Sequence, residues 1–186
     1  MTTLNENCSL VEVAALVSEA LEEAGIIAPL SGGAAMSMYT DNKYQTKDLD
    51  FVTTERAKAL IAVLGPLGFE ASSDGRHFVH RPSGWLVEFP PGPLAFGDTT
   101  ISSDDVPILE TKYGRIRVIT PTHSLMDRLA AYFHWNKQRT LRDQVRQLVS
   151  TPRSAEQLDW NELYRWADTE KIPRSAIDEV CGRQRS

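Results

Sequence analysis

Apolar residues follow two periods along the first 120 residues, one near 3.6 residues and one of two residues. The first is typical of amphipathic helices and the second of half-buried strands. Ser9 stands where a helix N-cap is expected and Gly25 where a helix ends. The elements expected here are helices at 9–24, 34–39 and 54–64 and strands at 26–30, 49–53, 69–82, 85–89, 106–110 and 115–119. Their interleaved order predicts an α+β fold with a mixed β-sheet and flanking helices.

The pattern becomes wholly helical after Thr120-Pro121. Helices are expected at 122–135, 140–149, 154–168 and 175–183, with Ser154 at the start of the third. We therefore expect an α/β core over residues 1–120 and a C-terminal helical region over residues 121–186 that packs on it. The core of this helical region is expected to contain five residues, for which a base-stacking platform is the alternative role: Trp135, Trp160, Leu163, Tyr164 and Trp166.

The chain has 186 residues, of which 41% are hydrophobic, enough for the core of one domain with a small helical extension. Its start lacks the basic and apolar runs of a signal peptide, and no window approaches the length of a membrane span. We therefore expect a cytoplasmic protein with no membrane partner. Cys8 and Cys181 have no neighbouring cysteine with which to form a metal-ligand pair, so both are expected to be plain thiols.

Asp48 and Asp50 alternate with Leu49 and Phe51 where a strand is predicted. Because side chains alternate between the two faces of a strand, both carboxylates are expected on one face. Two carboxylates held close together are unfavourable unless a cation lies between them, and hard oxygen ligands favour magnesium. The alternative is an ordinary exposed strand, since the Asp-x-Asp pattern also occurs by chance.

Ser31-Gly32-Gly33 lies between a predicted strand and a predicted helix. Glycines let the backbone approach a phosphate closely, and the first N–H groups of the helix, with its dipole, favour an anion there. Ser31 could add a hydroxyl group. Such a turn is weak evidence alone, and it gains weight from the aspartate pair that follows after one helix and one loop.

Glu88 is a charged residue in an otherwise apolar predicted strand. An acid there would complete a two-metal site, in which one ion lowers the pKa of an attacking hydroxyl and the other holds a triphosphate. Glu88 could also serve as the base, and the alternative is a surface glutamate on a half-exposed strand. His77 and His80 are three residues apart on the preceding strand and so point to opposite faces, which argues against zinc.

Two runs, Ser31 to Ala35 and Thr46 to Val52, resemble the Gly-Gly, helix, Asp-x-Asp signature of the DNA polymerase beta-like nucleotidyltransferases. The likeness is greatest to their small bacterial branch, the AbiEii-type toxins of type IV toxin–antitoxin systems. It extends over residues 26–149, where the segments 120–131 and 139–145 look like later family helices that bring a lysine and an Arg-Asp pair.

The resemblance implies a nucleotidyltransferase core that uses magnesium, with two ions, and a nucleoside triphosphate as substrate. It implies that the metal-binding and catalytic residues are Asp48, Asp50 and Glu88, with Asp143 lining the same site. The residues implied in nucleotide binding are Ser31, Gly32, Gly33, Lys43, Arg128 and Arg142.

Two positions depart from the family pattern. Arg128 stands where the family usually has lysine, which keeps the positive charge but replaces a compact point charge by a bidentate group. Tyr44 stands at the usual basic position four residues before Asp48, with Lys43 adjacent. These departures bear on the affinity for the nucleotide and on the identity of the acceptor substrate. They leave the aspartate pair, Asp48 and Asp50, intact.

Charge is uneven along the chain, whose net charge is −5. Residues 127–153 carry six basic and two acidic side chains, among them Arg139, Arg142 and Arg146 at helical spacing, which suits either a solvated face or a triphosphate or RNA end. We expect transfer of a nucleoside monophosphate to a hydroxyl of RNA, tRNA or a protein, with an antitoxin as a further partner. Two alternatives stay open: a small-molecule modifier resembling the aminoglycoside or lincosamide nucleotidyltransferases, and a non-catalytic binding protein.

Overall fold

The computed structural model describes residues 4–40, 46–135 and 138–183. The chain forms two compact units. The first consists of Met1–Ala35, Gln45–Leu94 and Ser102–Ile119. The second consists of Met36–Tyr44, Ala95–Ile101 and Thr120–Ser186, so two stretches from before residue 120 belong with the C-terminal helices.

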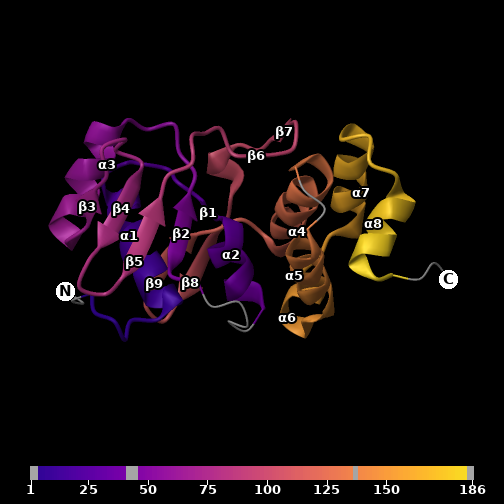
Figure 1. Ribbon diagram of the computed structural model, residues 1–186, viewed down its shortest axis with the longest axis horizontal. Helices are drawn as coiled ribbons and strands as arrows, with labels where there is room; N and C mark the ends of the chain where they lie inside the picture. The colour runs from indigo at the N-terminus through magenta and orange to yellow at the C-terminus, as the bar shows by residue number, and fades with distance from the viewer. Residues whose placement is uncertain (1–3, 41–45, 136–137, 184–186) are drawn as a thin grey trace. The chain divides into compact units, whose positions relative to one another are not determined.

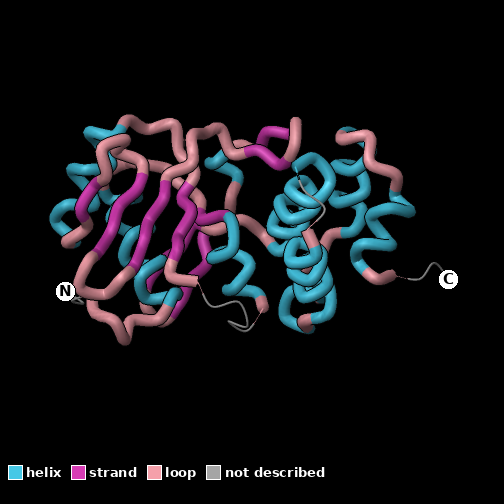
Figure 2. Tube along the Cα trace, in the orientation of Figure 1, coloured by secondary structure: helices cyan, strands magenta, loops and turns pink. Residues whose placement is uncertain are grey.

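The first unit is built on a five-stranded mixed sheet, which confirms the α+β expectation (Figures 1 and 2). The strands lie in the order β1 (Leu30–Ser31), β2 (Asp48–Phe51), β5 (Trp85–Glu88), β4 (His77–His80) and β3 (Glu70–Ala71). Strands β2 and β5 are parallel, whereas every other neighbouring pair is antiparallel. The mixed order brings the second strand of the β4–β5 hairpin beside β2.

One face of this sheet is buried and the other is open. On the two central strands, Leu49, Phe51 and Val87 are fully buried, while Asp48 and Leu86 on the alternate positions keep solvent exposure. The buried face belongs to a core that also receives apolar side chains from α1 (Leu10–Glu23) and α3 (Ala57–Leu64). This two-sided pattern leaves acids on the open face and anchors the strands that carry them.

Helix α1 begins at the residue that the sequence predicts. Ser9 accepts a hydrogen bond from the N–H of Glu12, and the Glu12 side chain accepts from the N–H of Ser9, which forms a capping box. The hairpin of β8 (Ile108–Thr111) and β9 (Gly114–Arg117) contacts α1 but forms a sheet of its own. Two short 3₁₀ turns, η1 (Gly65–Leu67) and η2 (Ser103–Asp105), complete the first unit.

The second unit is mainly helical. Its elements are α4 (Pro121–Ala130), a π-helical turn η3 (Ala131–Trp135), α5 (Arg139–Ser150), α6 (Pro152–Ala155), α7 (Trp160–Thr169), α8 (Arg174–Cys181) and the short hairpin of β6 (Ala95–Phe96) and β7 (Thr99–Thr100). Helix α2 (Gly32–Tyr39) begins in the first unit and ends in the second. No helix within the described ranges is long and apolar enough to cross a membrane.

The β6–β7 hairpin was not expected, and a buried acid holds it. The Glu170 carboxylate accepts hydrogen bonds from Asp98 N–H at 3.0 Å and from Thr99 Oγ1 at 2.6 Å, and it lies 3.2 Å from His134 Nε2. Gly97 fits against it, since a Cβ there would lie 2.1 Å from Glu170 Oε2. Trp166 adds an indole N–H bond to Phe96 O at 2.9 Å. Side chains distant in the sequence therefore fix this hairpin.

Three expectations were wrong. A single helix over 154–168 is instead two, because the Asp159 side chain caps the N–H groups of Asn161 and Glu162 and begins α7 there. Ser154 caps no helix; its buried hydroxyl bonds to Leu148 O and Thr151 O. Trp135 is 88% exposed and lies outside the helical core, whereas Leu163 and Trp166 are buried there.

Strand limits also shifted. The first strand covers only Leu30–Ser31 rather than 26–30, and Gly32 and Gly33 form the first turn of α2 instead of preceding it. The long strand expected over 69–82 is divided into β3 and β4 by a turn at Ser72–Gly75, where Asp74 accepts hydrogen bonds from backbone and side chain.

Candidate metal and nucleotide site

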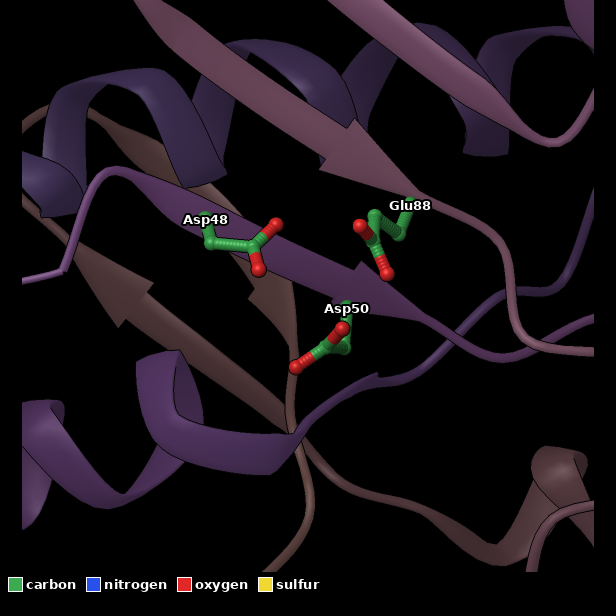
Figure 3. A group of neighbouring side chains, drawn as sticks. All are labelled: Asp48, Asp50 and Glu88. Atoms are coloured by element: carbon green, nitrogen blue, oxygen red, sulfur yellow. The ribbon is translucent and has the colours of Figure 1, made fainter.

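Three carboxylates lie together on the open face of the sheet. Asp48, Asp50 and Glu88 each offer one oxygen, and these oxygens lie within 4.8 Å of one another. Figure 3 shows Asp48 and Asp50 on one strand and Glu88 on its neighbour, all on the same side. Each of the three residues is half-buried. Three acids this close favour a cation among them.

Strand pairing explains this convergence. Strands β2 and β5 run parallel with Asp50 beside Glu88 and Asp48 beside Leu86. Alternation of side chains within each strand then puts all three acids on one face, as the sequence predicts for the aspartate pair. The pairing of β2 with β5 itself is a long-range feature, and it brings Glu88 next to residues almost forty positions earlier in the chain.

The start of β2 is fixed by local and long-range hydrogen bonds. Thr46 Oγ1 accepts from Asp48 N–H at 3.0 Å, which sets the backbone before the first aspartate. Lys47 turns away from the acids: its Nζ donates to Ser83 O at 3.0 Å and lies over the ring of Trp85. The cationic side chain that precedes Asp48 in the sequence is therefore engaged on the hairpin.

The surroundings of Asp48 disfavour its ionised form. Burial raises the pKa of Asp48 above its ordinary value of 3.8, and the charge of Glu88 raises it further, while His77 lowers it. Asp48 Oδ1 is buried and has no hydrogen-bond partner among the described residues. A buried carboxylate oxygen without a donor is unfavourable. Hard oxygen donors with one such orphan atom fit a divalent ion, magnesium included.

Gly32 lies directly against Asp50. A Cβ on Gly32 would lie 2.0 Å from Asp50 Oδ2, and the φ angle of Gly32 is +63°, in the left-handed region. Both conditions exclude a side chain at this position. Ser31, also buried, pairs with Asp50 across β1 and β2. The first turn of α2, with Gly32 and Gly33, thus begins beside the second aspartate, and binding of a triphosphate there stays a prediction.

His77 lies close to one of the three acids and Asp74 contacts His77, and the sequence pattern assigns neither residue to the site. His77 Nε2 lies 3.6 Å from Glu88 Oε1, and His77 Nδ1 lies 2.6 Å from Asp74 Oδ2. His77 and Glu88 are direct partners in the antiparallel pair of β4 and β5. Only the register of that pair could reveal the relationship, since alternation within one strand says nothing about the residue opposite.

The remaining residues predicted for the site do not lie in the described part of the first unit. Lys43 lies outside the described residues. Arg128, Arg142 and Asp143 belong to the second unit, where Arg128 Nε donates to Asp127 Oδ2 at 3.0 Å and Arg128 Nη1 to Gln144 Oε1 at 3.5 Å. Their roles toward a nucleotide or the reaction stay predictions.

Two of these residues have distinct surroundings on helix α5. Asp143 is exposed, with Arg139 Nε 3.7 Å away one turn earlier. Arg142 is half-buried, and its Nε has no hydrogen-bond partner in the part of the chain that the structure describes. A buried guanidinium N–H without an acceptor suits an anionic ligand.

No protein-family model matches the chain, and no curated protein matches it. Among solved structures, the chain is similar to the solution structure of the antibiotic-resistance factor ANT(2'')-Ia. The sequences are 16% identical, the alignment covers 93% of this chain and 89% of the other, and the TM-score is 0.44. A likeness at this level assigns neither a family nor an activity to the chain.

Proposed function

We propose that this protein is a metal-dependent nucleotidyltransferase, which transfers a nucleoside monophosphate from a nucleoside triphosphate to an acceptor hydroxyl and releases pyrophosphate. The observation that carries the proposal is the meeting of Asp48, Asp50 and Glu88 on one open sheet face, with a buried Asp48 oxygen that lacks a donor among the described residues. The Gly32–Asp50 contact supports it, because it puts the start of α2 next to the acids.

Asp48, Asp50 and Glu88 would hold divalent ions, and the family resemblance implies two magnesium ions. Such ions would neutralise the triphosphate and lower the pKa of the attacking hydroxyl. The chain contributes positioning and charge, which supply most of the catalysis in phosphoryl chemistry. Backbone N–H groups at Gly32 and Gly33, with Ser31, orient the triphosphate. The roles proposed for Lys43, Arg128 and Arg142 in binding the triphosphate, and for Asp143 in the reaction, rest on the sequence resemblance alone.

The bond changes follow from this arrangement. The acceptor oxygen attacks the α-phosphorus, and its proton passes to a Glu88 carboxylate oxygen. The bond between the α-phosphorus and the oxygen bridging to the β-phosphate breaks, so pyrophosphate leaves with that oxygen. Glu88 is suited to the base because its side chain is 36% exposed and so accessible to an incoming hydroxyl.

The acceptor is proposed to be an RNA or tRNA end or a protein hydroxyl, as in AbiEii-type toxins, with an antitoxin as partner and the cytoplasm as location. The sequence signature supports this narrower assignment, and the basic stripe at Arg139, Arg142 and Arg146 suits a polyanionic acceptor. Modification of a small cationic molecule is the competing outcome of the test below.

The test is transfer of label from each of the four α-labelled nucleoside triphosphates, with magnesium, to total RNA, to total protein or to a panel of aminoglycosides. Wild type is compared with Asp48→Ala/Asp50→Ala and with a matched control, Asp104→Ala/Asp105→Ala, which removes two exposed acids of η2. We expect transfer to RNA or protein by wild type and control only. Transfer confined to aminoglycosides would favour the small-molecule modifier. Absence of transfer and of magnesium-dependent nucleotide binding would support a non-catalytic protein.

A further inference from the structure

Trp135 is exposed at the end of the π-helical turn η3. It is 88% exposed, whereas Ile61, the next most exposed large apolar residue among those described, is 46% exposed. Tryptophan is enriched at binding surfaces, where a partner covers its large ring. π-Helical turns are rare and occur frequently at functional sites. Both features indicate that Trp135 contacts a ligand.

The turn that carries Trp135 is held from the protein interior. His134, the preceding residue, has its Nε2 3.2 Å from Oε2 of Glu170, whose side chain is buried. The rings of Tyr132 and Phe133 pack edge to face with their centroids 5.2 Å apart, and both residues are half-buried. An anchored turn holds the indole in place before a ligand arrives, which lowers the entropic cost of binding.

Two arginines follow Trp135 on helix α5. Arg139 is exposed, and Arg142 has a buried Nε–H with no acceptor among the described residues. Arg139 comes four residues after Trp135, so their Cα atoms lie at most about 14 Å apart. An N–H without an acceptor and a nearby exposed arginine suit a phosphate. A nucleotide combines an aromatic ring and phosphates within such a span.

The described chain neighbours of Trp135 are polar, which disfavours a protein partner. Four of them are exposed: His134, Gln138, Arg139 and Thr140. The core of a protein interface is an apolar patch depleted of charged residues. An exposed aromatic ring close to cationic side chains is instead typical of surfaces that bind single-stranded nucleic acid.

We propose that Trp135 stacks on a nucleobase while Arg139 and Arg142 bind the phosphates attached to it. An indole stacks on any base, because every base has a π-face. The nucleoside triphosphate and the end of an acceptor RNA share this chemistry, and the test below separates them. The inference rests on the proposed function, of which both are substrates, and it adds a contact to the base that the three carboxylates do not provide.

The experiment compares ligands that have a base with ligands that lack one, in the presence of magnesium. Each nucleoside triphosphate is titrated against inorganic triphosphate, and a short single-stranded RNA against the same strand with abasic residues at its 3′ end. The variants are Trp135→Ala, Trp135→Phe and, as a matched control, Trp160→Phe. Trp160 is a half-buried residue of α7 that contacts Arg183. Circular dichroism melts establish that each variant is folded.

For Trp135→Ala we expect about tenfold weaker binding of nucleoside triphosphates, of RNA or of both, and unchanged binding of inorganic triphosphate. Trp135→Phe should retain most of the affinity, and Trp160→Phe should match wild type. Loss confined to nucleoside triphosphates assigns the base to the donor, and loss confined to RNA assigns it to the acceptor. Equal affinity of Trp135→Ala and wild type for every ligand that has a base, or an equal loss for inorganic triphosphate, overturns the proposal.

Acrylamide quenching of tryptophan fluorescence provides an independent readout. Trp85 and Trp166 are buried and Trp160 is half-buried, so Trp135 is the tryptophan most accessible to the quencher. A saturating ligand that has a base should shield Trp135, and an absence of shielding contradicts stacking. Light scattering that shows a dimer in wild type and a monomer in Trp135→Ala would assign Trp135 to an interface between copies of the chain and would overturn the proposal.

Asp50→Asn separates failure of this inference from failure of the proposed function. Nucleotide binding that is lost in Asp50→Asn but unchanged in Trp135→Ala contradicts stacking and leaves the carboxylate site standing. Binding that depends on Trp135 but not on Asp50 supports stacking and contradicts the proposed function. Failure of wild type to bind any of these ligands overturns both.

Discussion

Gly32 packs against Asp50 so closely that a Cβ on Gly32 would lie 2.0 Å from Asp50 Oδ2. The backbone of Gly32 is also in the left-handed region, with φ +63°. Glycine is therefore required twice, once for its conformation and once for the space that the aspartate occupies. The start of helix α2 and the second acid of the candidate site are in this way one structural feature.

Gly32→Ala should reduce both stability and metal affinity. The left-handed backbone alone costs about 1–2 kcal/mol for alanine, and the methyl group must also displace the Asp50 carboxylate. Gly25→Ala is the matched control, because Gly25 has φ +72° and a Cβ added there would meet nothing within 4 Å. Urea unfolding and manganese titration measure the two effects. Stability should fall in both variants, but metal affinity only in Gly32→Ala; unchanged metal affinity there contradicts the role given to Gly32.

Asp48→Asn should stabilise the metal-free protein at neutral pH. The pKa of Asp48 in the folded state lies above the ordinary 3.8, because of burial and the charge of Glu88, so the folded state binds this proton more tightly than the unfolded state. Ionisation of Asp48 therefore lowers the free energy of unfolding as pH rises from the unfolded-state pKa to the higher folded-state pKa. We expect the Tm in EDTA at pH 7 to rise by about 1–3 °C.

The same variant should lose the stabilisation that a bound ion gives. Saturating magnesium or manganese should raise the Tm of wild type, since an ion that binds only the folded state stabilises it, and should leave Asp48→Asn nearly unchanged. Asp104→Asn, at an exposed position of η2, is the control and should behave as wild type in both buffers. If the Tm of Asp48→Asn in EDTA were lower than that of wild type, the ionised Asp48 carboxylate would not be destabilising in the metal-free protein.

Glu170 should make the second unit sensitive to acid. Burial would raise its pKa, but hydrogen bonds from Thr99 and Asp98 N–H and the charge of His134 outweigh burial and leave the pKa below the ordinary 4.5. Glu170 therefore stabilises the fold above its unfolded pKa, and this contribution is lost as pH falls through its folded pKa. Glu170→Ala should cost about 1–3 kcal/mol at pH 7, because the partly buried donors at Asp98 and Thr99 lose their acceptor.

Urea unfolding between pH 7 and pH 3 measures this contribution. Glu170→Gln should remove part of the acid sensitivity of wild type, whereas Glu156→Gln, at an exposed position before α7, should retain it. Identical pH profiles for Glu170→Gln and wild type would show that the Glu170 cluster does not govern acid unfolding.

Arg142→Lys should weaken triphosphate binding without lowering stability. The Arg142 Nε–H is buried and lacks an acceptor among the residues described, so an anion that receives it gains more than a surface contact. Lysine retains the positive charge but lacks the planar guanidinium that donates two hydrogen bonds at once. We therefore expect roughly tenfold weaker triphosphate binding. Arg165→Lys, exposed on α7, is the control. Equal affinity of Arg142→Lys and wild type for all four triphosphates would remove Arg142 from the nucleotide site.

Features that depend on neighbouring residues in the sequence were predicted better than contacts between distant segments. The period of two predicted Asp48 and Asp50 on one face without any knowledge of neighbouring strands, and Ser9, a residue type favoured at N-caps, predicted the start of α1. The contact between His77 and Glu88 depends on strand register, which alternation within a single strand does not encode. The sequence pattern therefore argued against His77 as a zinc ligand without revealing the acid opposite it.

The wrong helix start in the C-terminal helical region has a local cause, because two residues of a type favoured at N-caps lie close together. Ser154 and Asp159 are both residues that favour N-caps, and the pattern alone could not rank them. Asp159 reaches two N–H groups, whereas the Ser154 hydroxyl is buried on carbonyl oxygens of the preceding helix and turn. The residue type of Trp135 favours the core, yet Trp135 lies at the end of a π-helical turn and is 88% exposed.

The proposed function requires that Asp48, Asp50 and Glu88 bind divalent ions that hold a nucleoside triphosphate. The most direct measurement is equilibrium binding of the four α,β-methylene nucleoside triphosphates, which cannot release pyrophosphate, with magnesium, with manganese or with EDTA. We predict saturable binding that requires the ion and is lost in Asp50→Asn and Glu88→Gln while Asp104→Asn retains it. Binding that persists in EDTA, or that is equal in Asp50→Asn and wild type, would contradict this role of the three acids.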